Sequence, residues 1–296
     1  MAKVVVVGSI NVDMVFTSLV RPKAGETVLG QNFYTIPGGK GANQAVAASK
    51  LGADSYMIGC IGDDSNGEFS IKNLNTIGVD TKCIKKINDA PTGVANIIVA
   101  EGDNSIIVVP GSNYKITREI IEKNINVILD ADIVLLQLEI PMDVVEYTAE
   151  ICKKNNVKIM LNPAPAVELS EKLIDNSTYI TPNEHELKII FGRHNSENID
   201  DILKNYPNKL IVTMGSKGVR YYDGREIKSI PVYEVEVVDT TGAGDTFNGA
   251  LATVLVKSEN LENSIKFANK AAALSITKLG AQSGMPTLEQ LKSSCI

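Results

Sequence analysis

The sequence predicts an α/β fold, in which a central, mostly parallel sheet carries helices on both faces and a small antiparallel β lid stands beside it. Short apolar runs rich in β-branched residues recur along the chain, and stretches with helical periodicity separate them. Two regions, 14–34 and 92–109, interrupt this alternation with strand-like runs joined by turns. Together these observations predict a single domain over residues 1–296, with the lid formed by those two regions.

The strand-like runs have the composition of strands that are buried on both faces. Residues 4–7 are consecutive valines that end at Gly8. A strand of a parallel sheet covered by helices needs apolar residues at every position rather than at alternate ones. Similar runs occupy residues 56–61, 133–138, 157–161, 179–181 and 210–213.

Helix-like stretches lie between most of these runs. They occupy residues 42–51, 67–77, 142–155, 184–191 and 198–205. Parallel strands need crossover connections, which are usually helices, so this alternation predicts helices on both faces of the sheet.

The two regions without helices contain clear turn signals. Residues 22–25 and 101–104 combine proline, glycine, asparagine or aspartate between apolar runs. We expect a small antiparallel sheet with one apolar face here. Such a sheet either closes over a ligand or pairs with its copy on a second subunit.

Charge and residue usage exclude several classes of function. Lys and Arg total 29 and Asp and Glu total 35, a net charge of −6 without a basic stripe, so nucleic acid is not an expected partner. The apolar runs are too short to cross a bilayer and the N-terminus has no apolar signal core, so we expect a cytoplasmic protein without a membrane partner. The four cysteines form no Cys-x-x-Cys pair, and the two histidines, His185 and His194, are expected to be exposed, so neither a zinc site nor a histidine-based triad is expected.

The carboxyl ends of the predicted strands carry the first candidates for a site. Ligands of open parallel sheets bind at these ends, so polar or glycine-rich residues that directly follow the apolar runs are selected. They are Asn11, Asp13, Glu139, Asn162, Asn183 and the 213–218 turn.

The strongest chemical signal is the glycine-rich segment 238–247, which leads into an apolar helix at 248–255. Free amides at a helix start carry a partial positive charge of roughly +0.5, and Gly242 and Gly244 let a phosphate approach the backbone. Alternatively, the two glycines only shape a turn and Asp245 caps the helix. We favour the anion site, because a carboxylate beside a phosphate is unfavourable unless it handles a proton or a cation.

A second glycine-rich segment, 37–45, precedes another apolar helix. It is not a P-loop, since that motif needs a hydroxyl residue after the lysine and Gly41 follows Lys40 here. Two roles of this segment remain equally open. Its backbone either packs against a neutral, hydroxyl-rich ligand or forms a tight turn that caps the helix. Asn11 and Asp13 alternate along the chain and so point to one side, where they suit adjacent sugar hydroxyls or, equally, a strand-end turn.

Four segments resemble the signatures of the ribokinase-like (PfkB) carbohydrate kinase family. They are Gly-Ser-Ile-Asn-Val-Asp at 8–13, Gly-Gly-Lys-Gly-Ala-Asn-Gln-Ala at 38–45, Asn-Glu-His-Glu at 183–186 and Asp-Thr-Thr-Gly-Ala-Gly-Asp at 239–245. They follow the family's order and span nearly the whole chain. The resemblance implies the family's fold and ATP-dependent phosphorylation of a sugar hydroxyl. The first two segments and the run 161–166 narrow the expected sugar to a small furanose, with D-ribose first.

The resemblance assigns the chemistry to Asp245, which would take the proton from the primary hydroxyl of the sugar. An unperturbed aspartate has a pKa of about 3.9, so we expect this carboxylate to be ionised at neutral pH without a shift of its pKa. The amides of Gly242, Ala243 and Gly244 would form the anion hole for the transferred phosphoryl group. The sugar would contact Asn11, Asp13, Gly39, Lys40, Asn43, Glu139 and Asp245.

The resemblance also implies ATP, Mg²⁺ or another divalent cation, K⁺ as an activator, and a homodimer formed through the lid. Asn183 and Glu186 match the family's Asn-x-x-Glu motif, which is tied to magnesium and phosphate. Gly284 offers no hydroxyl and stands in a segment, 281–286, that departs from the family's pattern. The nucleotide would lie along Asn183, Thr213, Gly215, Ser216, Lys217, Gly218, Gly244 and Asn269. The monovalent cation would be held by Asp239, Thr241, Ser275, Lys278, Gly280 and Gly284.

Two other functions remain open. A related kinase would act on fructose, a nucleoside, a deoxy-keto acid sugar or a sugar phosphate, although no arginine cluster for a sugar phosphate accompanies Lys40. A sugar-binding regulator would keep the fold without the chemistry. The presence of Asp245, Gly242 and Gly244 argues against the regulator.

Overall fold

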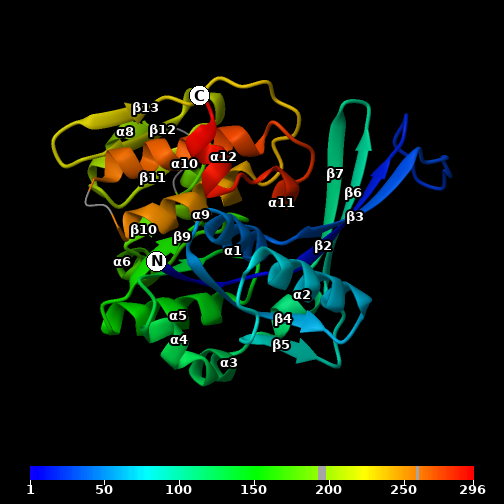
Figure 1. Ribbon diagram of the computed structural model, residues 1–296, viewed down its shortest axis with the longest axis horizontal. Helices are drawn as coiled ribbons and strands as arrows, with labels where there is room; N and C mark the ends of the chain where they lie inside the picture. The colour runs from blue at the N-terminus through cyan, green and yellow to red at the C-terminus, as the bar shows by residue number, and fades with distance from the viewer. Residues whose placement is uncertain (193–197, 258–259) are drawn as a thin grey trace.

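Six parallel strands form the centre of the computed structural model, which describes residues 1–192, 198–257 and 260–296 (Figure 1). Their order across the sheet is β10-β9-β8-β1-β4-β5. The chain fills one side of β1 first and then the other, and such a reversal of strand order marks where open parallel sheets bind ligands. The strands are β1 (Lys3–Val7), β4 (Asp54–Gly62), β5 (Ile84–Ile87), β8 (Ile133–Leu136), β9 (Lys158–Leu161) and β10 (Tyr179–Ile180).

The valines of β1 pack into cores on both faces of the sheet. Val4 and Val6 join one cluster of buried side chains, and Val5 and Val7 join the other, all with 0% exposure. Because successive side chains of a strand point to opposite faces, a strand covered on both sides needs an unbroken apolar run.

Helices cover both faces, as the alternation predicted (Figure 1). The face of Val4 and Val6 carries α1 (Lys40–Lys50), α2 (Ser65–Ile77), α9 (Ala243–Leu255), α10 (Leu261–Ser275) and α12 (Leu288–Ser293). The face of Val5 and Val7 carries α3 (Arg118–Lys123), α4 (Ile125–Leu129), α5 (Met142–Lys154), α6 (Glu171–Asn176), α7 (Glu184–Ile190) and α8 (Ile199–Lys204).

A three-stranded antiparallel sheet continues the central sheet beyond β10. Its strands are β11 (Ile211–Thr213), β12 (Val219–Tyr222) and β13 (Ile227–Ile230). Single parallel bridges, from Ile180 to Leu210 and from Asn183 to Thr213, attach its first strand to the edge of the central sheet. The whole arrangement is therefore mostly parallel, as expected.

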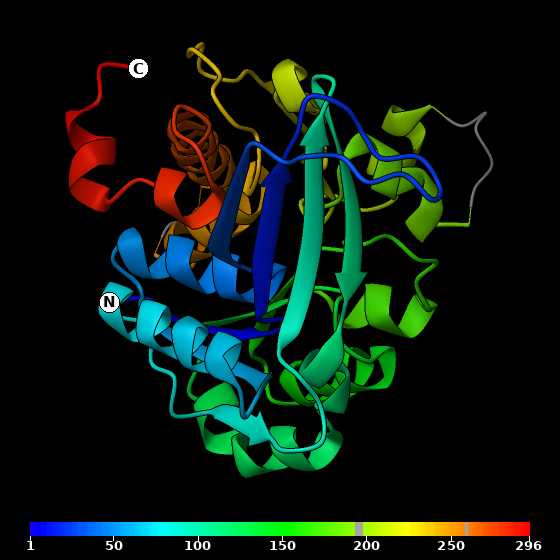
Figure 2. The same cartoon turned by 90° about the vertical axis from the view of Figure 1, so that its right-hand side faces the viewer.

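The lid is a four-stranded sheet that stands off the body (Figures 1 and 2). Its outer pairs are antiparallel as expected, whereas the central pair, β2 with β6, is parallel, because β4 and α2 lie between these strands in the chain. It also extends beyond the expected limits, since the strand that follows β1 already begins at Asn11. Its order is β3 (Asn32–Gly38), β2 (Asn11–Thr17), β6 (Gly93–Ala100) and β7 (Asp103–Val109).

The predicted strands and helices are present with modest shifts at their ends. The short strands β5, β12 and β13 were not predicted, nor were the helices α3, α4, α6, α10, α11 (Ala281–Gly284) and α12. His185 is exposed as expected, and His194 lies outside the described residues. Within the described ranges, no helix has both the length and the apolar character needed to span a membrane.

Candidate active site

Two helices that each begin after a glycine, α1 and α9, lie side by side and bring Asp245 against polar residues of α1. Asp245 Oδ2 accepts a hydrogen bond from Asn43 Nδ2 at 2.9 Å, and Asp245 Oδ1 accepts one from Gln44 Nε2 at 3.1 Å. Both carboxylate oxygens therefore bond to the neighbouring helix, which the helix-capping alternative does not explain. Each oxygen keeps a lone pair for a further donor.

Asp245 is buried, with 7% of its surface exposed. Burial raises its pKa, and the charge of Lys40 and the amides of Asn43 and Gln44 oppose this rise. The expectation that the pKa of Asp245 needs no shift is therefore wrong, because a sequence does not show how deeply a carboxylate is buried. The two amide donors favour the ionised form inside a site of low polarity.

Small residues bring α1 close to its neighbours. A Cβ built on Gly249 would lie 2.6 Å from Ala47 Cβ, and one built on Gly41 would lie 2.6 Å from the amide nitrogen of Ser9. Gly39, which precedes the helix, has a φ of +90°, which glycine adopts at little cost. The second glycine-rich segment is thus required by close packing of the chain and by the helix start.

The start of α9 is open to solvent. Gly244 is exposed, and a Cβ built there would meet no atom within 4 Å. Gly242, which precedes the helix, has a φ of +76° and lies against Ala281. Amides in a first helical turn lack acceptors inside the helix and carry partial positive charge. An anion can therefore approach this backbone directly beside Asp245.

Asn11 and Asp13 lie in β2 and point to one face of the lid sheet, as their spacing predicted. Asn113 Nδ2 donates to Asn11 Oδ1 at 2.7 Å, which leaves the amide nitrogen of Asn11 to donate to a ligand. A Cβ on Gly38 would lie 2.3 Å from Asp13 Oδ1, so the glycine makes room for this carboxylate.

Lys40 is close enough to four carboxylates for their charges to act on its ammonium. Burial lowers the pKa of its ammonium, but the charges of Asp245, Glu139, Glu186 and Asp13 outweigh burial and raise it. The lysine is therefore held in its charged form. The base and three residues predicted to contact the sugar, Asp13, Lys40 and Glu139, thus come together.

Glu139 ties the end of β8 to the start of α1. Ser9 Oγ donates to Glu139 Oε2, and the backbone amide of Lys40 donates to the same oxygen at 3.2 Å.

Burial raises the pKa of Asp13 to about 7, with further contributions from the charges of Glu139 and Asp245. The lid carboxylate thus titrates near neutrality in the absence of ligand.

The start of α7 carries Asn183 and Glu186 as a capping box. Asn183 Oδ1 accepts from the Glu186 amide at 2.8 Å, and Glu186 Oε2 accepts from the Asn183 amide at 2.8 Å. Burial raises the pKa of Glu186, and Lys40 is close enough to oppose the rise. Within the described residues, no group of three or more acidic, histidine or cysteine side chains gathers as a metal cluster. Glu186 is thus a single carboxylate at the border of the site.

The 213–218 turn lies next to α7, because Thr213 and Asn183 are bridged in parallel. Gly215, Ser216 and Lys217 of this turn are exposed, whereas Gly218 and Asn269 are buried. Asn269 Nδ2 donates to the carbonyl of Pro231 at 3.0 Å, so this side chain holds the loop after β13. The structure therefore offers an exposed strip of backbone between α7 and β12.

Asp239 organises the residues predicted to hold a monovalent cation. Its Oδ1 accepts from the Thr241 amide at 2.9 Å, and its Oδ2 accepts from the Gly280 amide at 2.8 Å. Burial acts to raise the pKa of Asp239, but the hydrogen bonds from Thr241 and Gly280 outweigh burial and lower it. Asp239 is therefore an anion at neutral pH.

Gly284 ends α11 (Ala281–Gly284) and packs against carbonyl oxygens at the end of α10 and just after it. A Cβ built on Gly284 would lie 2.2 Å from Ser275 O and 3.6 Å from Lys278 O. The Gly284 amide donates to the carbonyl of Gly280 at 3.1 Å. All six predicted residues thus lie in one region, and close packing explains why no hydroxyl side chain stands at position 284.

Three polar residues of the site were not predicted from the sequence. Gln44 stands in a recognised segment but received no role, although it follows Asn43 directly. Asn113 and Gln282 are buried and bond to Asn11 and Asn43, respectively. No local pattern marks them, because their partners lie far away in the chain.

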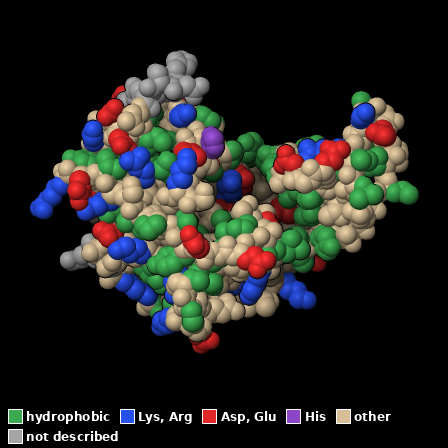
Figure 3. Space-filling model, turned by 90° about the horizontal axis from the view of Figure 1, so that it is seen from above, with side chains coloured by type: hydrophobic (Ala, Val, Ile, Leu, Met, Phe, Trp, Pro, Cys, Tyr) green, Lys and Arg blue, Asp and Glu red, His purple; other side chains and the backbone are tan. Residues whose placement is uncertain are grey.

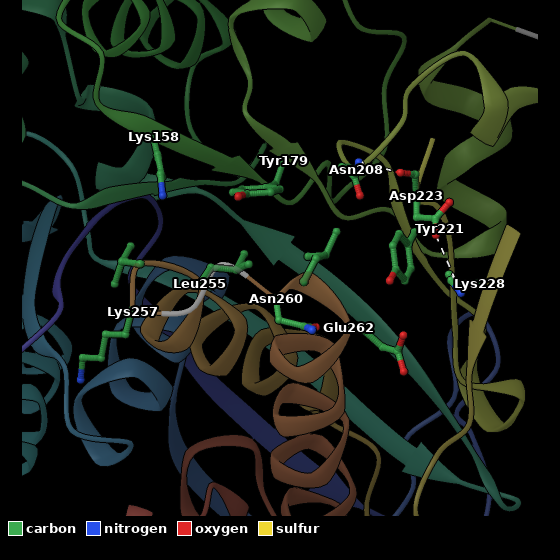
Figure 4. Close-up of a pocket in the computed structure, with 12 residues that line it drawn as sticks. Lys158, Tyr179, Asn208, Tyr221, Asp223, Lys228, Leu255, Lys257, Asn260 and Glu262 are labelled. Atoms are coloured by element: carbon green, nitrogen blue, oxygen red, sulfur yellow. Dashed lines mark hydrogen bonds and ion pairs between the residues drawn. The ribbon is translucent and has the colours of Figure 1, made fainter. Parts of the chain in front are cut away.

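The molecule is hollowed between the lid and the body, and charged side chains of both signs are exposed in this hollow (Figure 3). A separate pocket of about 810 Å³ lies at the opposite end of α9, beside Leu255 (Figure 4). Lys158 and Tyr179, at the amino ends of β9 and β10, also line it. It contains none of the predicted site residues.

Comparisons with known proteins agree over the full chain. The profile described as pfkB family carbohydrate kinase matches residues 1–288. The ribokinase of Bacillus subtilis (strain 168) is 47% identical over 292 residues, which cover 99% of each chain. The deoxyribokinase of Salmonella typhi is 36% identical and covers 97% of this chain and 96% of its own. The solved structure of Arabidopsis thaliana ribokinase complexed with ribose and ATP has a TM-score of 0.90 at 33% identity and covers 99% of this chain and 98% of that one.

Proposed function

The chain belongs to the pfkB family of carbohydrate kinases, and from this membership we propose that it transfers the γ-phosphoryl group of ATP to the primary hydroxyl of D-ribose, forming D-ribose 5-phosphate. The observation that carries the proposal is the buried carboxylate of Asp245 beside the exposed glycine backbone at the start of α9. Full-length relatives named ribokinase, at 47% and 43% identity, support ribose as the sugar.

In the proposed reaction, Asp245 acts as the general base. The hydroxyl oxygen of the sugar forms a bond to the γ-phosphorus while the bond from phosphorus to the bridging oxygen of ADP breaks, and the hydroxyl proton passes to Asp245. Asn43 and Gln44 hold the carboxylate in place and favour its ionised form. The amides of Gly242, Ala243 and Gly244 form the anion hole and stabilise the transferred phosphoryl group.

The sugar is held between the lid and the start of α1. Asn11 donates through its free amide hydrogens, and Asp13 and Glu139 accept hydrogen bonds from hydroxyls. Lys40 balances the surrounding carboxylates. Gly39 exposes backbone where a side chain would block a ligand, and Asn43 keeps one amide hydrogen free for the sugar.

The nucleotide lies along the strip between α7 and β12. The exposed 213–218 turn supplies the backbone of this strip. The buried Asn269 holds the loop after β13 in place through its hydrogen bond to the carbonyl of Pro231. The residues assigned to the nucleotide are Asn183, Thr213, Gly215, Ser216, Lys217, Gly218, Gly244 and Asn269.

Two cations fit the residues present. Mg²⁺ neutralises phosphate charge when bound. The single carboxylate of Glu186, at the border of the site, fits a metal whose other ligands are phosphate oxygens and water. K⁺ adds positive charge near the anion hole when bound. The anionic Asp239 and the backbone carbonyls clustered around Gly284 fit a large cation with oxygen ligands. The assigned set is Asp239, Thr241, Ser275, Lys278, Gly280 and Gly284.

We further infer a cytoplasmic, single-domain protomer that dimerises through the lid. The strand register separates the faces of the lid sheet: Asp13 shares its face with Ala95 and Val108, whereas Phe16, Phe33 and Ile107 lie on the other face. Ile107 is 66% exposed and Phe33 is 54% exposed. A second lid that covers this outer apolar face would remove it from water.

An ATP-consumption assay over several acceptors tests the proposal. We expect the highest kcat/KM with D-ribose among D-ribose, 2-deoxyribose, fructose, adenosine and fructose 1-phosphate. If 2-deoxyribose is phosphorylated as well as ribose or better, the chain is instead a deoxyribokinase, as the Salmonella relative is named. The Asp245→Asn variant controls for contaminating kinases, and no turnover of any acceptor by the wild type contradicts the kinase function.

A further inference from the structure

A row of side-chain amides runs from α2 to Asp245, and every member donates in the same direction. Asn73 Nδ2 donates to Gln282 Oε1 at 2.7 Å, and Gln282 Nε2 donates to Asn43 Oδ1 at 2.9 Å. Asn43 Nδ2 then donates to Asp245 Oδ2 at 2.9 Å. The row thus delivers an N–H group to the carboxylate at its end.

Gln282 reinforces the orientation of the Asn43 amide that an ionised carboxylate requires. A terminal amide has a donor and an acceptor end of nearly the same shape, and turning it over would aim Asn43 Oδ1 at the Asp245 carboxylate. Asn73 occupies the acceptor of Gln282, so Gln282 presents its donor to Asn43. Asn43 must then present its own donor to Asp245.

The two members of the row nearest to Asp245 lie out of water, and the backbone of Gln282 in α11 is held in place. Gln282 and Asn43 are 4% and 6% exposed, so their hydrogen bonds act in a medium of low polarity, where a wrongly oriented dipole is costly. Lys50 Nζ donates to the backbone carbonyls of Gln282 at 2.6 Å and Met285 at 3.1 Å. These bonds fix the backbone from which Gln282 reaches Asn43.

We propose that Gln282 is a positioning residue for Asp245: acting through Asn43, it keeps an amide donor on the carboxylate and so keeps the base ionised and aligned. The inference rests on the proposed function only for its effect on catalysis. The orientation of Asn43 also affects the protonation of Asp245 in the free protein, where no substrate is needed to measure it.

Two substitutions separate the parts of this role. Gln282→Glu keeps the chain length and the acceptor for Asn73 but loses the donor to Asn43. Gln282→Met removes both polar atoms without adding a charge. Gln290→Glu is the matched control, because Gln290 is exposed in the capping box of α12, where glutamate serves equally well.

The decisive measurement is the pKa of the Asp245 side chain, followed by carboxyl ¹³C NMR with the signal assigned through Asp245→Asn. We expect both Gln282 variants to raise it by about one unit, because a carboxylate that loses a hydrogen-bond donor is a stronger base. With ribose and ATP, the acid limb of kcat should move to higher pH by the same amount, while the KM for ATP stays within about twofold.

An unchanged Asp245 pKa in both variants, with Gln290→Glu behaving as the wild type, overturns the positioning role. Failure of the wild type to phosphorylate ribose contradicts the proposed function alone, since the NMR titration still tests the row of amides.

Discussion

Asn113 Nδ2 donates to Asn11 Oδ1 at 2.7 Å, and this contact leaves the amide nitrogen as the group that Asn11 can offer to a ligand. Asn113 Oδ1 also accepts from the Ile10 amide at 2.9 Å. Asn113→Asp keeps that acceptor but places a carboxylate against Asn11 Oδ1, so the Asn11 amide turns over and presents an acceptor to the ligand. We expect the ribose KM to rise about tenfold with the ATP KM unchanged, as one misplaced hydrogen bond predicts. Asn104→Asp, at the exposed lid hairpin, is the control, and an unchanged ribose KM in Asn113→Asp would refute this orientation.

Removal of the base should abolish most turnover while the protein still folds. Asp245→Asn preserves the size of the side chain but cannot take up the proton, and loss of a general base costs about 10²- to 10⁴-fold in kcat. ATP binding measured by calorimetry should stay near the wild-type value, because the anion hole consists of backbone amides. A kcat close to that of the wild type would remove Asp245 from the chemistry.

The raised pKa of Asp13, about 7, predicts pH-dependent sugar binding. The ionised carboxylate accepts hydrogen bonds from hydroxyls, so ribose affinity should weaken as the pH falls from 8 to 6. Asp13→Asn should lose this dependence and bind ribose weakly at every pH. A ribose titration at constant ionic strength checks both statements, and an equal pH dependence in wild type and variant would contradict them.

The same pKa predicts that Asp13 lowers stability above neutral pH. Its folded pKa lies above the value of about 3.9 expected for the unfolded chain, so between these values the folded state binds more protons and stability falls as the pH rises. Asp13→Asn should therefore raise Tm relative to the wild type by about 2 °C or more at pH 8. The difference should shrink toward pH 5, and a difference that does not vary with pH would contradict the shift.

The open backbone at Gly244 predicts a loss of function without a loss of fold. A methyl group there meets no protein atom within 4 Å, so Gly244→Ala should leave Tm within about 2 °C. The same methyl group occupies space needed by the anion, so kcat/KM for ATP should fall by about 10²-fold, as for the loss of one anion-hole contact. A large drop in Tm would show that the glycine serves the fold instead.

Two adjacent residues of β7 test the proposed dimer, because the strand places them on opposite faces of the lid. Ile107→Glu puts a charge on the outer apolar face and should convert a dimer into a monomer in sedimentation velocity. Ile106→Glu, on the face of Asp13, should leave the dimer intact and raise the ribose KM instead. A wild type that sediments as a monomer excludes the lid dimer.

The predictable parts of the fold and of the site are those that depend on short runs of neighbouring residues. The valines of β1 predicted the buried parallel strand, and the glycines before Asp245 predicted a helix start with open backbone beside a carboxylate. The hairpin of β12 and β13 was missed although Asp223 and Gly224, a dipeptide typical of tight turns, stand at its tip.

Burial and distant partners were not predictable. The pKa of Asp13 depends on Glu139 and Asp245, which only the folded chain brings near it. Gln282 reaches Asn43 across most of the sequence, and its segment drew attention only as a departure from the family's pattern. Its role follows from the direction of each hydrogen bond, which no sequence pattern specifies.

Only Gly8, Ser9 and Ile10 separate the end of β1 from the start of β2. Any rotation of the lid about this short link carries Asn11 and Asp13 with it, while Asp245 stays behind in α9. A change in the position of the lid would therefore alter the distance between the two sugar-binding candidates and the base, which belong to different parts of the fold.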